Sequence, residues 1–445
     1  MARPMSTLVV GAGVTGLGAA LLLARRGVAV EVWEGSADAG GLLAPVPFRG
    51  VDCDRGSHRV HLGAHPALWK ITPRERWLER KRLGRLILGG RAVPYPPHAL
   101  GVLSGLGPRA ALEMGGDFLL RRGRWRRFVS WEAARRAPAA ESDEGFEAFV
   151  RARVGESSYQ RFYRPYVEKV WGASPAELSR SVAKQRLSIE SPLAALARAA
   201  FRDPPRFLYP ARGMSSVIAD LRAELSRLGV EIRYETPATL DALARAPHDA
   251  ILHSGHLSDL LPDSGLDHRG LYLLHLAVDR ASASEEDTFY APEAELWFGR
   301  VSRIDRFSPA LARPGEAILC VEIPEGRLGA GRDFLPEIDA VLDQLQRVRI
   351  LKRRARLFEA RQTYLPRVYP LYLRGWWTRW AAALSRLRAA EPRLLPIGRQ
   401  GLFLHCNLDQ CAAIAAAAVE HLVSGQDAAA WAQRAASFLE LRVRD

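Results

Sequence analysis

The opening of the chain alternates between apolar runs and glycine in a way that predicts a strand, a helix and a second strand. Residues 7–10 form a short apolar run that ends at Gly11, residues 16–26 are rich in alanine and leucine, and residues 28–33 alternate up to Trp33. Short apolar runs bounded by glycine are typical of buried strands, and the longer small-residue run is typical of a buried helix. A strand, a helix and a second strand in this order form the basic unit of a parallel sheet.

Further along the chain, similar patterns predict the remaining elements. Strand-like segments lie at 83–97 around a Gly-Gly turn, at 230–234, 249–252, 271–278, 296–301 and 317–323, and as a strand–turn–strand at 394–405. Helical patterns cover 99–200, 214–228, 333–348, 376–390 and 409–424. Strands that alternate with helices indicate an α/β protein.

Three glycines follow the first predicted strand with the spacing G-x-G-x-x-G: Gly11, Gly13 and Gly16. In such a motif the first glycine allows a tight turn, the second lets backbone amides approach a pyrophosphate, and the third lets the helix pack on the strand. Glu34 ends the second predicted strand, where a carboxylate can accept hydrogen bonds from ribose hydroxyls. This arrangement predicts a dinucleotide site at the start of the helix.

Two further features bear on which dinucleotide binds. An acid at position 34 suits a free 2′-hydroxyl, which favours FAD or NAD over NADP. Gly40 and Gly41 follow it, and a backbone that runs close to a cofactor needs residues without side chains. The glycine pair therefore favours FAD over NAD.

The length of 445 residues exceeds one ordinary core, so we expect more than one domain. We predict a doubly wound, Rossmann-like FAD-binding domain that is discontinuous, and a second, α+β domain that carries the substrate. The first is expected to comprise residues 1–60, 205–262 and 391–430. The second is expected to comprise residues 61–204 and 263–390, largely helical in 99–200 and with a sheet in 268–375.

The net charge of +14 comes almost wholly from arginine, since the lysines are few: Lys70, Lys81, Lys169, Lys184 and Lys352. The charge can attract phosphate-bearing substrates or an acidic membrane surface. Alternatively, the arginines form an ordinary basic surface that faces solvent. The arginines are dispersed and no nucleic-acid-reading module is recognisable, so we do not expect nucleic acid as a partner.

Hydrophobic residues make up 48% of the chain, as in soluble globular proteins, and no apolar run is long enough to span a bilayer. No secretory signal precedes the first strand, so a cytoplasmic protein is expected. The cysteines Cys53, Cys320, Cys406 and Cys411 lack metal-like spacing, and we predict no metal site. Cys406 and Cys411 are open to interpretation as a redox pair, but packing is favoured because the spacing is not C-x-x-C.

The order of motifs resembles the FAD-dependent protoporphyrinogen oxidase and amine oxidase superfamily, especially its branch near UDP-galactopyranose mutase. Besides the glycine motif, the resemblance rests on segments spread over most of the chain: Gly56–His61, Phe162–Gly172, Tyr209–Met214, Phe298–Arg300, Tyr369–Tyr372, Gly398–Gly401 and Asn407–Asp409.

By this resemblance, Arg399, Gly401 and Asp409 lie along the flavin, where backbone amides at a helix start can stabilise negative charge on the reduced ring. His58 is placed beside the ring, although a structural histidine is an equal alternative. Asn407 or Asp409 can also be an ordinary helix cap.

Two further residues match positions that bind the substrate diphosphate in the mutases. Arg300 offers a planar guanidinium for bidentate phosphate contact, and Tyr369 precedes a proline in the matching segment. We therefore expect His58, Arg300 and Tyr369 to take part in catalysis.

The resemblance implies an enzyme that oxidises a small molecule at a C–N or C–C bond by hydride or electron-pair transfer to FAD. The alternatives are a non-redox, flavin-dependent nucleotide-sugar mutase, whose substrate carries phosphate, and a flavin-free relative that binds a partner. A homo-oligomer is left open.

Overall fold

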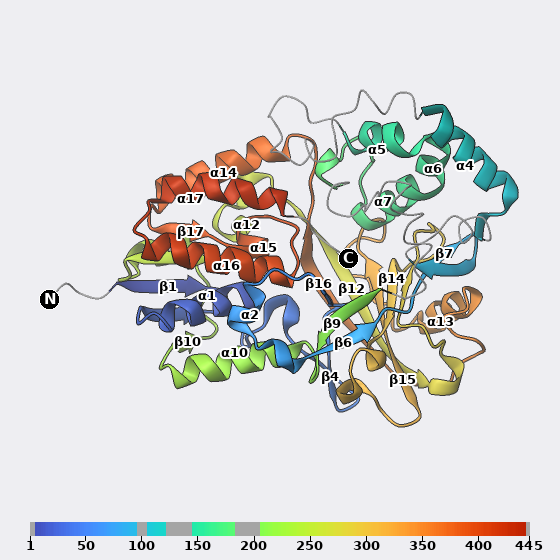
Figure 1. The fold of residues 1–445 in the computed structure, drawn as a ribbon, viewed down its shortest axis with the longest axis horizontal. Coiled ribbons are helices and arrows are strands. Elements are labelled where there is room, and N and C mark those ends of the chain that lie inside the picture. Colours follow the sequence, from blue (N-terminus) through green and yellow to red (C-terminus); the bar gives the residue numbers. More distant parts are fainter. Residues whose placement is uncertain (1–4, 96–104, 122–144, 183–204, 442–445) are drawn as a thin grey trace.

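The computed structural model describes residues 5–95, 105–121, 145–182 and 205–441. In Figure 1 a parallel sheet with its helices occupies one end of the molecule, and a larger sheet occupies the other. The helices from α4 (Pro108–Arg121) to α7 (Arg164–Trp171) lie beyond the upper edge of the larger sheet in this view.

The parallel sheet has five strands in the order β10-β2-β1-β11-β17. Its strands are β1 (Ser6–Val10), β2 (Ala29–Trp33), β10 (Glu231–Arg233), β11 (Ala250–His253) and β17 (Leu394–Pro396). All neighbouring pairs are parallel, and the strand order reverses between β1 and β11. Such a reversal is the switch point of a doubly wound sheet, where ligands bind beyond the carboxyl ends of the strands. The predicted fold class is confirmed.

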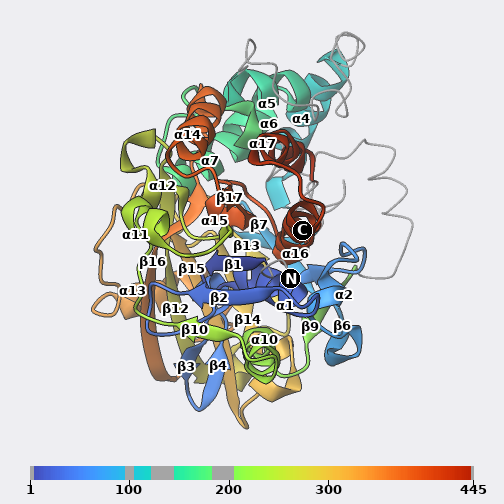
Figure 2. The same cartoon turned by 90° about the vertical axis from the view of Figure 1, so that its left-hand side faces the viewer.

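Helix α1 (Val14–Ala24) joins β1 to β2 and packs between two other helices, α10 (Ser215–Arg227) and α16 (Leu408–Val423). Figure 2 shows these three helices on one side of the parallel sheet and α11 (Leu240–Arg245) on the other. Nearly every residue of α1 is buried, which explains why its sequence is apolar on all sides.

The larger sheet has seven strands in the order β16-β12-β15-β14-β13-β7-β8. Its strands are β7 (Gly84–Leu88), β8 (Arg91–Tyr95), β12 (His268–Asp279), β13 (Thr288–Tyr290), β14 (Arg300–Arg303), β15 (Glu316–Pro324) and β16 (Leu357–Pro370). Its neighbours are antiparallel except β13 and β7. Both faces are covered: Leu271 and Leu273 join the main core, whereas Tyr272 and Leu274 join a second core with α13 (Ile338–Arg347).

Small sheets and helices complete the described ranges. The small sheets pair β3 (Val46–Phe48) with β4 (Val51–Cys53), and β9 (Arg206–Pro210) with β5 (Val60–His61) and β6 (Trp77–Lys81). The other helices are α2 (Leu68–Ile71), α4 (Pro108–Arg121), α5 (Phe146–Val154), α6 (Glu156–Ser158), α7 (Arg164–Trp171), α12 (Leu257–Leu260), α14 (Trp376–Ala390), α15 (Gly398–Gly401) and α17 (Ala428–Ser437). No helix within the described ranges is both long and apolar enough to cross a membrane.

The prediction of a strand over 296–301 is wrong for most of its length, because β14 begins only at Arg300. The preceding loop is shaped by Lys169 of α7. Its ammonium nitrogen lies 2.5 Å from the carbonyl oxygen of Ala291 and 2.9 Å from that of Phe298, and the carbonyls of Glu293 and Leu296 also face it. These four carbonyls are thus directed toward one ammonium group instead of along a regular strand ladder.

The predicted strand–turn–strand over 394–405 is also wrong in its second half. After β17 the chain forms the single helical turn α15, in which the amide of Leu402 donates to the carbonyl of Gly398. Gly398 has a φ of +71°, which favours glycine and turns the chain out of the sheet direction. Part of the predicted helical stretch 99–200 lies outside the described residues; in the rest, helices α4 to α7 are present.

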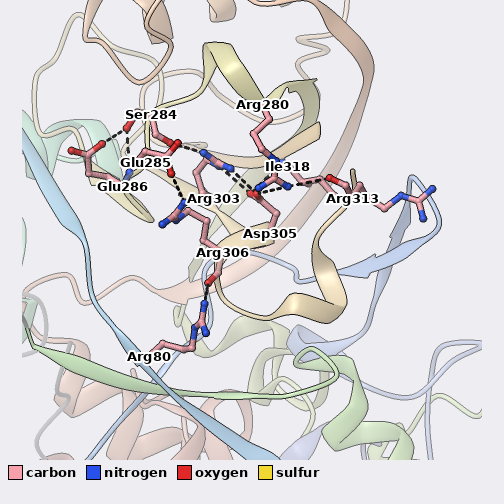
Figure 3. A network of polar contacts seen from close by, with 10 residues as sticks. All are labelled: Arg80, Arg280, Ser284, Glu285, Glu286, Arg303, Asp305, Arg306, Arg313 and Ile318. Atoms are coloured by element: carbon pink, nitrogen blue, oxygen red, sulfur yellow. Dashed lines mark hydrogen bonds and ion pairs between the residues drawn. The ribbon is translucent and has the colours of Figure 1, made fainter. Parts of the chain in front are cut away.

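A buried ion pair fixes the end of β14 against β15 (Figure 3). The Nε and Nη2 atoms of Arg303 lie 3.0 Å and 2.6 Å from the two carboxylate oxygens of Asp305, and both side chains are almost fully buried. Arg303 also donates to the carbonyl of Ser284, and Asp305 accepts from the amide of Ile318. The pair is therefore hydrogen-bonded to the surrounding backbone on both sides.

Candidate functional site

The loop between β1 and α1 contains two glycines that the protein itself requires. A Cβ atom on Gly16 would lie 1.8 Å from the carbonyl oxygen of Gly11, and one on Gly11 would lie 2.6 Å from the Oγ of Ser254. Gly11 also has a φ of +96°, which side chains rarely adopt. These two glycines allow the tight turn and the close approach of α1 to the loop.

Gly13 is different, because nothing in the described protein requires a glycine there. Its φ of −77° suits any residue, and a Cβ atom on it would meet no described atom within 4 Å. Gly13 directly precedes α1, whose first turn contains no acidic residue. A bare backbone at the amide end of a helix, open on its outer side, fits a pyrophosphate.

The second glycine pair lies beside this loop. Gly40 forms an isolated bridge with Gly13, its amide lies 2.9 Å from the carbonyl oxygen of Ala12, and it has a φ of +131°. A Cβ atom on Gly41 would lie 3.5 Å from the Cα of Gly13. The predicted cofactor residues Gly13, Gly40 and Gly41 are therefore neighbours.

Glu34 holds the glycine loop from the end of β2. Its Oε2 accepts from the amide of Ala12 at 2.6 Å, and its Oε1 accepts from the amide and the hydroxyl of Ser36 at 2.9 Å and 2.6 Å. A carboxylate has about four acceptor positions, so these bonds leave capacity for a further donor.

The short helix α15 packs against both the parallel sheet and the helix that follows the glycine loop. A Cβ atom on Gly401 would lie 2.3 Å from the carbonyl oxygen of His253, and one on Gly398 would lie 2.6 Å from the Oγ1 of Thr15 in α1. α15 thus lies against both the carboxyl end of β11 and the first turn of α1. This is the switch point of the parallel sheet.

Arg399 is held in place within this turn. Its guanidinium donates to the carbonyls of Cys406 at 3.1 Å and Val368 at 2.9 Å, and it lies 5.5 Å from the ring centre of Tyr369. The Tyr369 ring also contacts the rings of Trp171 and His405. The structure therefore brings Arg399 and Tyr369 together.

Helix α16 begins with a capping box in which Asn407 and Gln410 satisfy each other's backbone amides. Asp409 does not cap the helix; its carboxylate accepts from the amide of His65 at 3.0 Å. The residue places the loop before α2 next to the start of α16.

Glu322 on β15 is a functional candidate that sequence reasoning missed. Its two oxygens each lie 2.7 Å from a nitrogen of Arg300, the residue directly opposite on β14, and its Oε1 accepts from the amide of Ser57 at 2.8 Å. The sequence feature that could have identified it is an acidic residue inside the otherwise apolar predicted strand at 317–323. The Glu322 carboxylate balances the charge of Arg300, and its bond from the Ser57 amide fixes the position of the loop that carries His58.

His58 lies close to these charges. The pKa of its imidazole is lowered to about 4, mainly by burial; Glu322 opposes this shift, and Arg300 and Arg399 contribute to it. His58 is therefore neutral at physiological pH. The predicted residues His58, Arg300, Tyr369 and Arg399 thus share one electrostatic environment.

Two more arginines lie next to this group. The Nη2 atoms of Arg59 and Arg82 lie 3.1 Å and 2.6 Å from the hydroxyl oxygen of Tyr290, which is opposite Arg300 across β13 and β14. Arg59 also pairs with Asp287. Two carboxylates, Asp287 and Glu322, thus face three arginines, so the surroundings of Arg300 are positive. In the described part of the chain, no cluster of histidine, cysteine and acidic residues could hold a metal ion.

Asp54, just before the His58 loop, is buried and accepts from the hydroxyl of Tyr209 at 2.8 Å. Burial raises its pKa from 3.8 to about 7, so the folded protein holds a proton that the unfolded chain releases. Its stabilising effect is complete below pH 3.8 and is lost as the pH rises through 7. The buried His253 and His275 act in the opposite direction: burial lowers their pKa values from 6.5 to about 4, so stability is lost as the pH falls below 6.5.

We expect Asp54→Asn to make the protein more sensitive to acid than the wild type. Between pH 7.5 and pH 5, protonation of the wild-type Asp54 offsets about 2 kcal/mol of the unfolding free energy that is lost because the histidines become protonated. Asparagine does not titrate and removes this offset. Urea unfolding of both proteins across this pH range measures the difference. Parallel pH profiles for the two proteins would contradict the assignment of a raised pKa to Asp54.

Comparisons with known proteins agree with this architecture. Residues 9–72 match the model of the NAD(P)-binding Rossmann-like domain. No curated protein matches the chain in sequence.

Solved structures match over nearly the whole chain. Reduced UDP-galactopyranose mutase superposes with a TM-score of 0.79 at 18% identity, over 99% of this chain and 98% of its own. A protein from Exiguobacterium sp. 255-15, described as a candidate protoporphyrinogen oxidase, gives a TM-score of 0.69 at 19% identity, over 95% and 100%. A double mutant of putrescine oxidase gives a TM-score of 0.62 at 12% identity, over 95% and 100%. The chain therefore has the same overall fold as these three proteins, and its residues 9–72 match a Rossmann-like domain model.

Proposed function

We propose that the chain binds FAD at the amino end of α1. The observation that carries this proposal is Gly13, a glycine that neither the backbone conformation nor the packing of the described protein requires. In the proposal, the backbone from Gly11 to Gly16 holds the pyrophosphate, Glu34 accepts from a ribose hydroxyl, and Gly40 and Gly41 border the cofactor.

The other end of the cofactor would lie toward α15 and α16. Arg399, Gly401 and Asp409 sit at this end, and the free amides at the start of α16 point along its axis. Bound FAD would supply a two-electron acceptor there. We assign the FAD-binding domain to residues 1–60, 205–262 and 391–430, and the substrate domain to residues 61–204 and 263–390.

The chemistry we propose is oxidation of a small molecule at a C–N or C–C bond, with a hydride or electron pair passed to FAD. The charge on Arg300 is already balanced by its bidentate pair with Glu322, and His58 is neutral. These features suit a substrate whose reacting part is uncharged. Tyr369 and Arg300 would orient the substrate, and the neutral His58 imidazole could donate or accept one hydrogen bond.

A second candidate is a flavin-dependent, non-redox mutase that acts on a nucleotide sugar. Two observations favour it: the whole-chain likeness to UDP-galactopyranose mutase, and the excess of positive charge from Arg59, Arg82 and Arg300 over Asp287 and Glu322. Guanidinium groups bind diphosphates well. Glu322 counts against this candidate because it already occupies two nitrogens of Arg300.

We expect the purified protein to carry the absorption spectrum of a bound flavin. Under anaerobic conditions, bleaching by an amine or a related reduced substrate would support the oxidase, since the electrons must reach the flavin. Turnover of nucleotide sugars only after reduction with dithionite would support the mutase instead. A colourless protein that gives no heat signal with FAD in a calorimeter would contradict both and favour a flavin-free relative.

A further inference from the structure

Two cysteines meet across the first turn of α16. The sulfur atoms of Cys406 and Cys411 lie 3.5 Å apart, with Cys406 just before the N-cap residue Asn407 and Cys411 in the first turn. Apolar residues at these two positions commonly pack together and fix the entry of the chain into a helix. Here the contact is made by two thiols, so the same packing places two oxidisable groups side by side.

The other two cysteines have different surroundings. Cys53 and Cys320 are completely buried, whereas Cys406 and Cys411 retain 5% and 6% of their exposure. All four cysteines are buried, and the pair is the less deeply enclosed of the two sets. Cys53 and Cys320 therefore serve as internal controls for the reactivity of Cys406 and Cys411.

The surroundings of Cys411 also favour its thiolate. The bond with Cys406 lowers the pKa of Cys411, and the Thr15 hydroxyl and Arg399 lower it as well, which outweighs the opposing effect of burial. Burial is the main cause that raises the pKa values of Cys53 and Cys320. Cys411 also lies in the first turn of α16, at the positive end of its dipole. Thiolates beside arginine and at helix starts are the nucleophilic form of cysteine.

We propose that Cys406 and Cys411 form a dithiol that a hydroperoxide oxidises to an intramolecular disulfide. In the first step the Cys411 sulfur attacks the peroxide, the O–O bond breaks, and an alcohol or water leaves. This step converts Cys411 to a sulfenic acid. In the second step the Cys406 sulfur attacks the Cys411 sulfur, the S–O bond breaks, and the departing hydroxide takes the Cys406 proton to form water.

The geometry permits this closure. A disulfide requires the two sulfurs to lie about 2 Å apart, so they must approach by about 1.5 Å from their present separation of 3.5 Å.

The test uses the full chain, reduced with dithiothreitol and then freed of it, and treated with a small molar excess of hydrogen peroxide. We expect the intact mass to fall by two hydrogen atoms, and peptide mapping to locate the new bond between Cys406 and Cys411. Dithiothreitol should restore the original mass. The measurement depends on no bound cofactor, so it stays informative whether or not the protein binds FAD.

The variants Cys406→Ser and Cys411→Ser separate the two roles. With Cys406 replaced, Cys411 should gain one oxygen and react with dimedone; with Cys411 replaced, oxidation should slow at least about tenfold. No mass change in the wild type, or a bond mapped to Cys53 and Cys320, would overturn the proposal. The wild-type peptide map decides the matter even if a variant fails to fold.

Discussion

Replacing Gly13 by valine should abolish FAD binding while leaving the apo fold intact. A Cβ atom here would meet no described atom within 4 Å, and the observed φ of −77° suits a residue with a side chain, so we expect the apo protein to fold. The same side chain would occupy the space that the proposed pyrophosphate needs at the amino end of α1. We expect the affinity for FAD to fall at least about 100-fold, which is about 3 kcal/mol.

Titration of the apo protein with FAD, followed by fluorescence quenching or calorimetry, measures this loss, and circular dichroism checks the fold. Gly16→Ala is the matched control, because its Cβ would lie 1.8 Å from the carbonyl oxygen of Gly11. That variant should lose thermal stability whether or not FAD is present. If Gly13→Val bound FAD as tightly as the wild type, the proposed location of the cofactor would be wrong.

Replacing Asp305 by alanine should destabilise the protein by about 3–5 kcal/mol, because it leaves the Arg303 guanidinium buried without its partner. The two side chains are 1% and 0% exposed, and Asp305 also accepts from the amide of Ile318. A charge in these surroundings can neither reach water nor move to another acid at low cost. Equilibrium unfolding in urea measures the effect.

A double variant, Arg303→Met with Asp305→Leu, should recover a large part of this loss, since it removes both charges and keeps apolar volume. The surface pair Arg386–Asp263 is the matched control: its side chains are 49% and 71% exposed, so Asp263→Ala should change stability far less than Asp305→Ala. Equal losses for Asp305→Ala and Asp263→Ala would show that burial does not govern the energy of the pair.

The elements that the sequence predicts well are those determined by neighbouring residues. The run from Thr7 to Trp33 holds a strand, a glycine turn, a helix and a second strand within one short segment, and the structure contains all four. The same is true of the hairpin of β7 and β8 around Gly89 and Gly90. Local apolar patterns and glycine positions are enough to define such units.

The elements that the sequence does not predict depend on partners far away in the chain. The carbonyls of the loop before β14 bind Lys169, which lies more than a hundred residues earlier in the chain. In the same way, the resemblance pointed to Arg300 as a phosphate ligand, but nothing in the sequence showed that Glu322 would lie opposite it. Register between strands decides such pairs, and a single sequence does not reveal register.

The residues of the candidate site fall into the same two groups, those of one contiguous motif and those from distant segments. The glycine loop and Glu34 form a contiguous motif, and the structure places them together. His58, Arg300, Tyr369 and Arg399 come from four distant segments and were selected by resemblance alone. The structure brings them close to one another, and their roles stay predictions until a substrate is known.

The order in which the parallel sheet is assembled has a consequence for synthesis of the protein on the ribosome. β1 and β2 are made first, but β17, at the far edge of the same sheet, lies at Leu394–Pro396, and α16, which covers α1, follows it. The nascent unit of β1, α1 and β2 must therefore wait until α16 has been made before its apolar helix is covered on both sides. We expect slow folding dominated by distant contacts, with a long interval in which chaperones can bind the unshielded helix.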